Sequence, residues 1–177
     1  LVQLGRGEQA AKLLEAADGA SPEVQTALGL RAMQDKDARR ARDHFQRAIE
    51  SGKASALTYF EYAMLLRGTG GAKEEVKRYL LEAVGRNPAL AEAQFLVGLM
   101  AQQENRHREA IASFEKAVEV LPRQSYFWHA LALSWHALGD DDRARRTARK
   151  AADSATTAAH SASRLVALDS SLEVAAS

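Results

Sequence analysis

Histidine, hydroxyl and acidic side chains are the residues of this 177-residue chain whose spacing could support chemistry. His129 and His136 are seven positions apart, about 10 Å along a helix. Paired metal ligands on one helix usually lie three or four residues apart, as in the HExxH motif. His44, His107 and His160 are isolated in the sequence. We therefore expect surface or groove histidines and no bound metal ion.

The hydroxyl groups gather near the C-terminus without the sequence context of an activated nucleophile. None lies in a GxSxG or SxxK motif. The GTGG stretch at 68–71 has no following Lys-Ser or Lys-Thr pair and no preceding strand pattern, so it does not indicate a phosphate-binding loop. It is interpreted as a turn between helices. The hydroxyl residues are Ser154, Thr156, Thr157, Ser161, Ser163, Ser170 and Ser171.

Acidic clusters are interpreted as helix starts. Glu74-Glu75 and the aspartates at 140–142 precede helix-forming stretches, where negative charge complements the helix dipole. The basic stretches could form a patch for RNA or phospholipid, or a solvated outer face with ion pairs. The formal net charge of +1 and the absence of interleaved aromatic residues favour the solvated face and no nucleic-acid partner. The basic residues are Arg39, Arg40, Arg42, Arg47, Arg143, Arg145, Arg146, Arg149 and Lys150.

Composition indicates a soluble, all-α protein. Hydrophobic residues make up 46% and charged residues 27% of the chain, and strong helix formers dominate. The absence of cysteine excludes disulfides, thiolate metal sites and cysteine nucleophiles. No apolar run reaches about 18 residues, so no membrane insertion is expected, and the compartment stays open between cytoplasm and periplasm. The chain starts at Leu1 within a repeating pattern, so we expect a segment of a longer polypeptide.

A triplet of small, bulky and small residues at steps of four and three recurs along the chain. These steps place all three side chains on one helical face, where small residues let two helices approach and bulky ones fill the remaining space. The first residues of successive triplets are 31, 35, 34 and 34 positions apart. The triplets are Ala10, Leu14, Ala17; Ala41, Phe45, Ala48; Val76, Leu80, Ala83; Ala110, Phe114, Ala117; and Ala144, Ala148, Ala151.

Two further marks recur with the triplets. A residue pair precedes each complete copy, namely Leu28-Gly29, Ala63-Met64, Val97-Gly98 and Leu131-Ala132, and prolines follow at Pro88 and Pro122. The combined pattern resembles the tetratricopeptide repeat family. The best match consists of Gln94, Val97, Gly98, Ala101, Ala110, Phe114, Ala117 and Pro122, and the last copy supplies Trp128, Leu131, Ala132, Trp135, Ala144, Ala148 and Ala151.

The sequence departs from the family pattern at several positions. Gln94 stands where the family favours Trp, and Ala101 where it favours Tyr. Val76 and Met64 replace small residues, and a Gly-rich stretch, RGTGGAK, replaces a tight turn in the second copy. One degenerate copy is common in such arrays.

The resemblance implies an all-α fold: a right-handed superhelical solenoid of antiparallel helix pairs. We expect an array over 1–153, made of a half repeat at 1–20 and pairs at 22–55, 56–88, 89–122 and 123–153. Leu165, Leu168 and Leu172 follow at helical spacing, so 154–177 is predicted to be a helix that caps the last pair. A frayed tail is the alternative.

The family's groove-lining positions give the candidate site. Its members bind partner segments along a concave groove formed by the first helix of each pair. Chaperone-binding members hold a C-terminal carboxylate there with Lys, Asn and Arg, which are absent from these positions, so no carboxylate clamp is expected. Trp128 and Trp135 match packing positions and are interpreted as core. The expected groove residues are Glu23, Thr26, Leu30, Met33, Thr58, Glu61, Leu65, Glu92, Phe95, Leu99, Gln102, Tyr126, His129, Leu133 and His136.

These patterns predict a non-catalytic scaffold that binds an apolar or amphipathic protein or peptide segment, without a cofactor. The alternative is an accessory domain of a larger enzyme, for example a hydrolase, whose catalytic part lies outside this segment. The chain's own C-terminal helix could instead fill the groove. A monomer, or weak self-association through end-to-end stacking, is expected.

Overall fold

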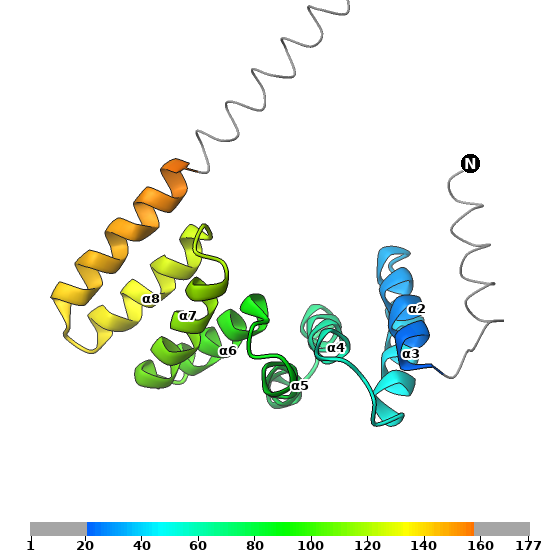
Figure 1. Ribbon diagram of the computed structural model, residues 1–177. Coiled ribbons are helices and arrows are strands. Elements are labelled where there is room, and N and C mark those ends of the chain that lie inside the picture. Colours follow the sequence, from blue (N-terminus) through cyan, green and yellow to red (C-terminus); the bar gives the residue numbers. More distant parts are fainter. Residues whose placement is uncertain (1–20, 158–177) are drawn as a thin grey trace, which may run out of the picture. The chain divides into compact units, whose positions relative to one another are not determined.

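The computed structural model describes residues 21–157, which are helical apart from short connections. The helices are α2 (Pro22–Gln34), α3 (Ala38–Glu50), α4 (Ala56–Gly68), α5 (Lys73–Arg86), α6 (Ala91–Gln103), α7 (His107–Val120) and α8 (Ser125–Ala137). A further helix, called the 141–157 helix, follows α8 (Figure 1). Residues 21–157 contain no strand. The expected all-α solenoid of packed helix pairs is confirmed.

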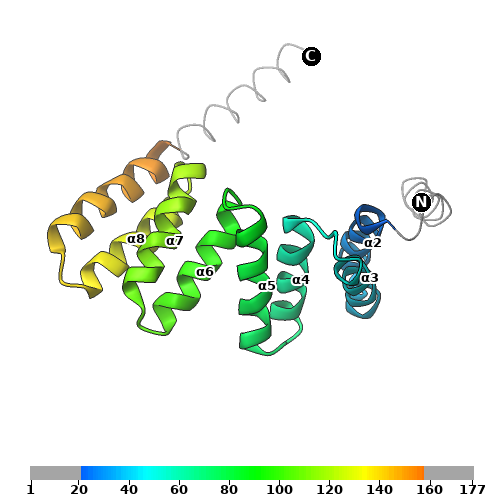
Figure 2. The ribbon, with the colours of Figure 1, turned by 60° about the horizontal axis from the view of Figure 1, so that its bottom comes forward.

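The chain divides into two compact units, residues 1–88 and 89–177. In the first unit α2 packs on α3 and α4 on α5, and in the second α6 packs on α7 and α7 on α8. Figure 2 shows α8 beside the 141–157 helix. The expected half repeat at 1–20 lies outside the described residues, as does most of the expected cap at 154–177. Residues 154–157 continue the helix that begins at 141.

The repeated triplets form the contacts within the helix pairs. The side chains at 41, 45 and 48, at 76, 80 and 83, and at 110, 114 and 117 are all buried. A Cβ atom built on Gly98 would lie 2.5 Å from Cε1 of Phe114, and one on Gly29 would lie 2.7 Å from Cε1 of Phe45. The phenylalanine rings therefore occupy the space that the two glycines leave free, as the spacing predicts.

The last triplet departs from this pattern. Ala148 is exposed, and Ala144 and Ala151 are only half-buried. The buried residue of this helix is Thr147, one position before Ala148. The triplet Ala10, Leu14 and Ala17 lies outside the described residues. The expected packing marks thus hold for three triplets, and the 141–157 helix is joined to its neighbours by other side chains.

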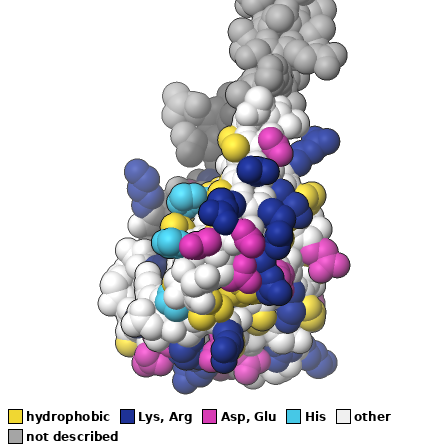
Figure 3. Space-filling model, turned by 90° about the vertical axis from the view of Figure 1, so that its left-hand side faces the viewer, with side chains coloured by type: hydrophobic (Ala, Val, Ile, Leu, Met, Phe, Trp, Pro, Cys, Tyr) yellow, Lys and Arg dark blue, Asp and Glu magenta, His cyan; other side chains and the backbone are white. Residues whose placement is uncertain are grey.

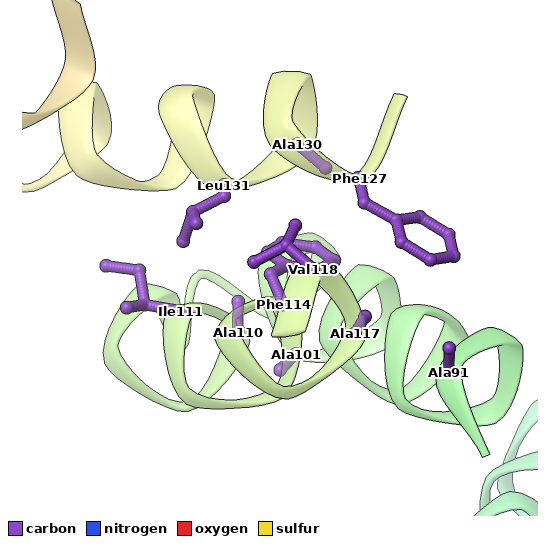
Figure 4. Packing of buried hydrophobic residues seen from close by; sticks show 10 residues of the cluster. All are labelled: Ala91, Ala101, Ala110, Ile111, Phe114, Ala117, Val118, Phe127, Ala130 and Leu131. Atoms are coloured by element: carbon purple, nitrogen blue, oxygen red, sulfur yellow. The ribbon is translucent and has the colours of Figure 1, made fainter. Parts of the chain in front are cut away.

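The core of the second unit comes from α6, α7 and α8 (Figure 4). Phe114 and Phe127 are fully buried, and Phe95, Leu99 and Trp128 pack against the cluster from its margin. The rings of Phe95 and Phe127 stack with centroids 4.7 Å apart, which links α6 to α8. The buried members are Ala91, Ala101, Ala110, Ile111, Phe114, Ala117, Val118, Phe127, Ala130 and Leu131.

One backbone turn recurs after the first helix of each pair. Lys36, Gly70, Asn105 and Gly139 have φ values of 60°, 76°, 58° and 78°, and they are 34, 35 and 34 positions apart. Each is followed by an N–H that donates to a carbonyl five residues earlier, as from Arg106 to Ala101 at 2.8 Å. This is the Schellman arrangement that ends a helix. At RGTGGAK, Gly70 adopts this same turn, and the expected departure consists of one extra residue before α5 begins.

Candidate partner-binding face

Helices α6 and α8 bring the expected groove residues of the second unit onto one surface, called here the α6–α8 face. Its residues on α6 are Glu92, Phe95, Leu99 and Gln102, and those on α8 are Tyr126, His129, Leu133 and His136. They recur at steps of three, four and three along each helix, which keeps each set on one side. The two helices contact each other directly.

Aromatic and aliphatic side chains form the centre of this face. The rings of Phe95 and Tyr126 meet edge to face with centroids 5.0 Å apart. Tyr126 and Leu133 are each 48% exposed, whereas Phe95 and Leu99 are half-buried against the core. Burial and the negative charge of Glu92 raise the pKa of the Tyr126 phenol, so it stays a neutral hydrogen-bond donor at physiological pH. The face therefore exposes apolar side chains, Tyr126 and Leu133, above two residues that are packed against the core.

Polar side chains hold the two helices in register. Nε2 of Gln102 donates to Oγ of Ser134 at 3.0 Å and to the Ala130 carbonyl at 3.4 Å. Ser134 is fully buried, and its hydroxyl also donates to the Ala130 carbonyl. Gln102 thus bridges the two helices. Its hydrogen bonds satisfy a buried hydroxyl that would otherwise be costly.

The two histidines on α8, His129 and His136, are exposed and lie seven residues apart on the helix. Nδ1 of His136 is 2.8 Å from Oδ1 of Asp141, and both side chains are largely solvent-exposed. Within residues 21–157 there is no group of three or more His, Cys, Asp or Glu side chains that could hold a metal ion. The expected interpretation of His129 and His136 as surface histidines agrees with this arrangement.

In the first unit, α2 and α4 enclose a small pocket of about 280 Å³. Expected groove residues in its lining are Glu23, Thr26, Leu30 and Thr58. Oγ1 of Thr26 lies 2.8 Å from Oγ1 of Thr58, which is itself 3.1 Å from Oγ of Ser55. This chain of hydroxyl groups joins the two helices at the base of the pocket.

Burial differs among the expected residues of the first unit. Thr26, Thr58 and Leu65 are buried, so they shape the surface and offer little contact area. Leu30, Met33 and Glu61 are half-buried, and Glu23 is exposed. Burial raises the pKa of the Glu61 carboxyl, whereas the hydrogen bond from the Ser21 hydroxyl lowers the pKa of Glu23.

Sequence spacing missed three apolar residues of this pocket, namely Pro22, Ala27 and Leu57. Leu57 lines it and is 44% exposed. It precedes the expected position Thr58 by one residue, and helical spacing alone assigns it to a different side of α4. The feature of the sequence that could have identified Leu57 is the N-cap Ser55. The Ser55 hydroxyl accepts from the Thr58 N–H, so α4 starts there and Leu57 lies in its first turn.

The acidic clusters do begin helices, as expected. Glu74 and Glu75 lie in the first turn of α5, and Oδ1 of Asp140 accepts the Arg143 N–H at 2.9 Å. Arg143 and Arg145 pair with Asp140 and Asp142 at 3.2 and 2.6 Å. Two basic residues at the start of the 141–157 helix thus form ion pairs on a solvent-exposed face. No helix within the described residues is both long and apolar enough to cross a membrane.

Comparison with known proteins agrees with the helix-pair geometry. The family model described as tetratricopeptide repeat matches residues 91–122. No curated protein matches the sequence.

The fold is similar to solved structures at low sequence identity. A crystal structure of MamA is 22% identical, with 86% of this chain and 88% of that chain covered and a TM-score of 0.70. A MamA RS-1 ArsTM double mutant is 19% identical over 88% and 89% of the two chains, with a TM-score of 0.68. YrrB is 19% identical over 87% and 80%, with a TM-score of 0.66. Residues 91–122 therefore match a tetratricopeptide repeat, and the described helix pairs share the fold of these solved structures.

Proposed function

We propose that the chain is a non-catalytic scaffold whose α6–α8 face binds an apolar or amphipathic segment of another protein. The observation that carries this proposal is the pair of 48%-exposed side chains, Tyr126 and Leu133, on a face underlain by Phe95 and Leu99. Exposed tyrosine and leucine on a rigid base give contact area at a low cost in side-chain entropy.

The charges near the face support a partner that carries a basic residue beside its apolar segment. Glu92 stands at the Tyr126 end and raises its pKa, so a basic residue flanking the apolar segment would find an opposite charge there. The pocket between α2 and α4 offers a similar combination of leucine, hydroxyl groups and Glu23. YrrB, a structure with a similar fold, is described as a TPR protein with an unusual peptide-binding site, which supports peptide binding as the function of this fold.

The experiment is site-specific photo-crosslinking in the native cell. A photoreactive phenylalanine analogue at position 133 should yield adducts with one partner segment, identified by mass spectrometry. The same analogue at Leu138, which is 41% exposed but lies beyond α8, should not. Adducts with the chain's own residues 158–177, in place of a partner, would contradict the proposal and favour self-occupation.

Substitution provides the matched affinity test with the partner segment so identified. Leu133→Glu should weaken its binding at least tenfold because a charge would face the apolar segment, whereas Leu138→Glu should leave binding unchanged. Both variants should keep the circular dichroism spectrum and urea midpoint of the parent. Equal binding by both variants would show that the α6–α8 face is not the site.

A further inference from the structure

A second pocket lies on the opposite side of α8 from the α6–α8 face. It has a volume of about 500 Å³ and lies among α7, α8 and the 141–157 helix. Its apolar floor is formed by Trp128, Leu131 and Trp135, which recur at steps of three and four along α8. Trp128 and Trp135 are the only two tryptophans of the chain. We call this site the tryptophan pocket; the sequence pattern had assigned both indoles to the core.

Opposite charges line two sides of the tryptophan pocket. Glu115 and Glu119 project from α7, and Arg146 and Lys150 from the 141–157 helix. Each pair is four residues apart, so each forms a short row about 6 Å long along its helix. Among the described residues, none of these four side chains has an ion-pair partner within 4.0 Å. The two rows therefore face the pocket without neutralising each other.

Cations also lie against the indole rings of the floor. The Lys150 ammonium is 4.7 Å from the ring centroid of Trp128, and the Arg143 guanidinium is 4.5 Å from that of Trp135. Nε1 of Trp128 donates to the Pro122 carbonyl at 2.8 Å, which fixes the ring. The Pro122 carbonyl also accepts from the Ser154 hydroxyl at 3.1 Å, which ties the 141–157 helix to the connection between α7 and α8. The pocket is thus held by contacts within its own helices.

Figure 3 shows this end of the molecule. Lys and Arg side chains gather beside Asp and Glu side chains, with hydrophobic side chains visible among them. A cavity of this size falls within the range typical of ligand sites, about 300–1,000 Å³, and combines an apolar floor with a few polar groups. An occupant with one uniform charge would be attracted by one row and repelled by the other.

We propose that the tryptophan pocket binds an amphipathic helix of another protein that carries an apolar stripe between an acidic edge and a basic edge. The apolar stripe covers Leu131 and the parts of the two indoles that Arg143 and Lys150 leave open. The acidic edge pairs with Arg146 and Lys150, and the basic edge pairs with Glu115 and Glu119. A helix fits because charges four residues apart on each of its edges have the same rise as the two rows. This site is independent of the α6–α8 face.

The experiment uses the full chain and three synthetic helical peptides of about 15 residues with capped termini, a common leucine stripe and no tryptophan. One peptide carries Glu along one edge and Lys along the other, the second carries Glu on both edges, and the third carries Lys on both. Because both tryptophans line the pocket, intrinsic tryptophan fluorescence reports its occupation. The mixed peptide should bind about tenfold more tightly than either uniform peptide.

Charge-neutral variants locate the binding site. Lys150→Gln and Glu119→Gln should each weaken binding of the mixed peptide several-fold. Arg149→Gln should not, because Arg149 is exposed on the same helix but does not line the pocket. Equal affinity for all three peptides, or equal loss with Arg149→Gln, would overturn the proposal. A fluorescence shift with protein concentration alone would also overturn it, because a second copy of the chain would then be the occupant.

Discussion

Single residues decide how closely the helices of each pair approach. Gly98 lies against the ring of Phe114, and Gly29 bears the same relation to Phe45. Both rings are fully buried, so neither can move aside without disturbing the neighbouring helix. Glycine at these two positions is therefore a requirement of packing, and helix propensity alone would oppose it.

Gly98→Ala should lower the free energy of unfolding by about 1–3 kcal/mol, because the added Cβ would lie 2.5 Å from Cε1 of Phe114. The measurement is urea unfolding followed by circular dichroism. Gly85→Ala is the matched control: it lies within α5 with nothing within 4 Å of an added Cβ, and should gain about 0.5–1 kcal/mol. A stabilising Gly98→Ala would contradict the packing described here.

Glu61→Gln should stabilise the protein at pH 7, with a benefit that disappears under acidic conditions. Burial raises the pKa of Glu61 above its ordinary value of 4.5, so the folded state binds this proton more tightly than the unfolded state. The resulting penalty on stability grows as pH rises from about 4.5 through the folded-state pKa. Urea midpoints of variant and parent, compared from pH 4 to pH 7, test this, and a difference independent of pH would contradict a burial effect.

At the scale of elements, helix pairs are positioned by a shared turn whose central residue has positive φ. Glycine fills this position at Gly70 and Gly139, but Lys36 and Asn105 adopt the same conformation elsewhere. Left-handed backbone is costly for a residue with a Cβ, although asparagine tolerates it better than most. The turn is therefore imposed by the packing of the two helices that it joins.

Removing a glycine from this turn should lower the free energy of unfolding, and introducing one should raise it. Gly139→Ala should cost about 1 kcal/mol, although nothing lies within 4 Å of the added Cβ, because φ is 78°. Lys36→Gly should gain about 0.5 kcal/mol, since relief of the left-handed strain outweighs the greater entropy of unfolded glycine. Thermal unfolding at matched buffer conditions measures both. The same sign for both changes would show that side-chain contacts dominate the turn.

The fold could be predicted from the sequence because its marks are local. Steps of four and three put Ala110, Phe114 and Ala117 on one buried face whatever the rest of the chain does. The tryptophan pocket could not be predicted, because it depends on how α7, α8 and the 141–157 helix meet, and side chains from all three line it. The positive φ of Lys36 could not be predicted for a similar reason, because it follows from the packing of the two helices that the turn joins. The regular spacing of 34 or 35 positions between the turns can be read from the sequence.

At the scale of the molecule, two compact units divide the chain at residue 88. The hydrophobic cluster of the second unit is drawn entirely from α6, α7 and α8. Both tryptophans, the α6–α8 face and the tryptophan pocket also belong to this unit. The second unit therefore contains a complete core together with both proposed binding surfaces.

Residues 89–177 alone should consequently fold, because every member of their cluster lies within 91–131. We expect a helical circular dichroism spectrum and one cooperative urea transition, seen equally by circular dichroism and tryptophan fluorescence. Phe114→Ala in this fragment should lower its free energy of unfolding by about 3–5 kcal/mol, since the ring is completely buried between α6 and α8. A fragment without helical signal, or one unaffected by Phe114→Ala, would show that the core of the second unit requires residues 1–88. A folded fragment that binds the mixed-charge peptide with parental affinity would place that site wholly within residues 89–177.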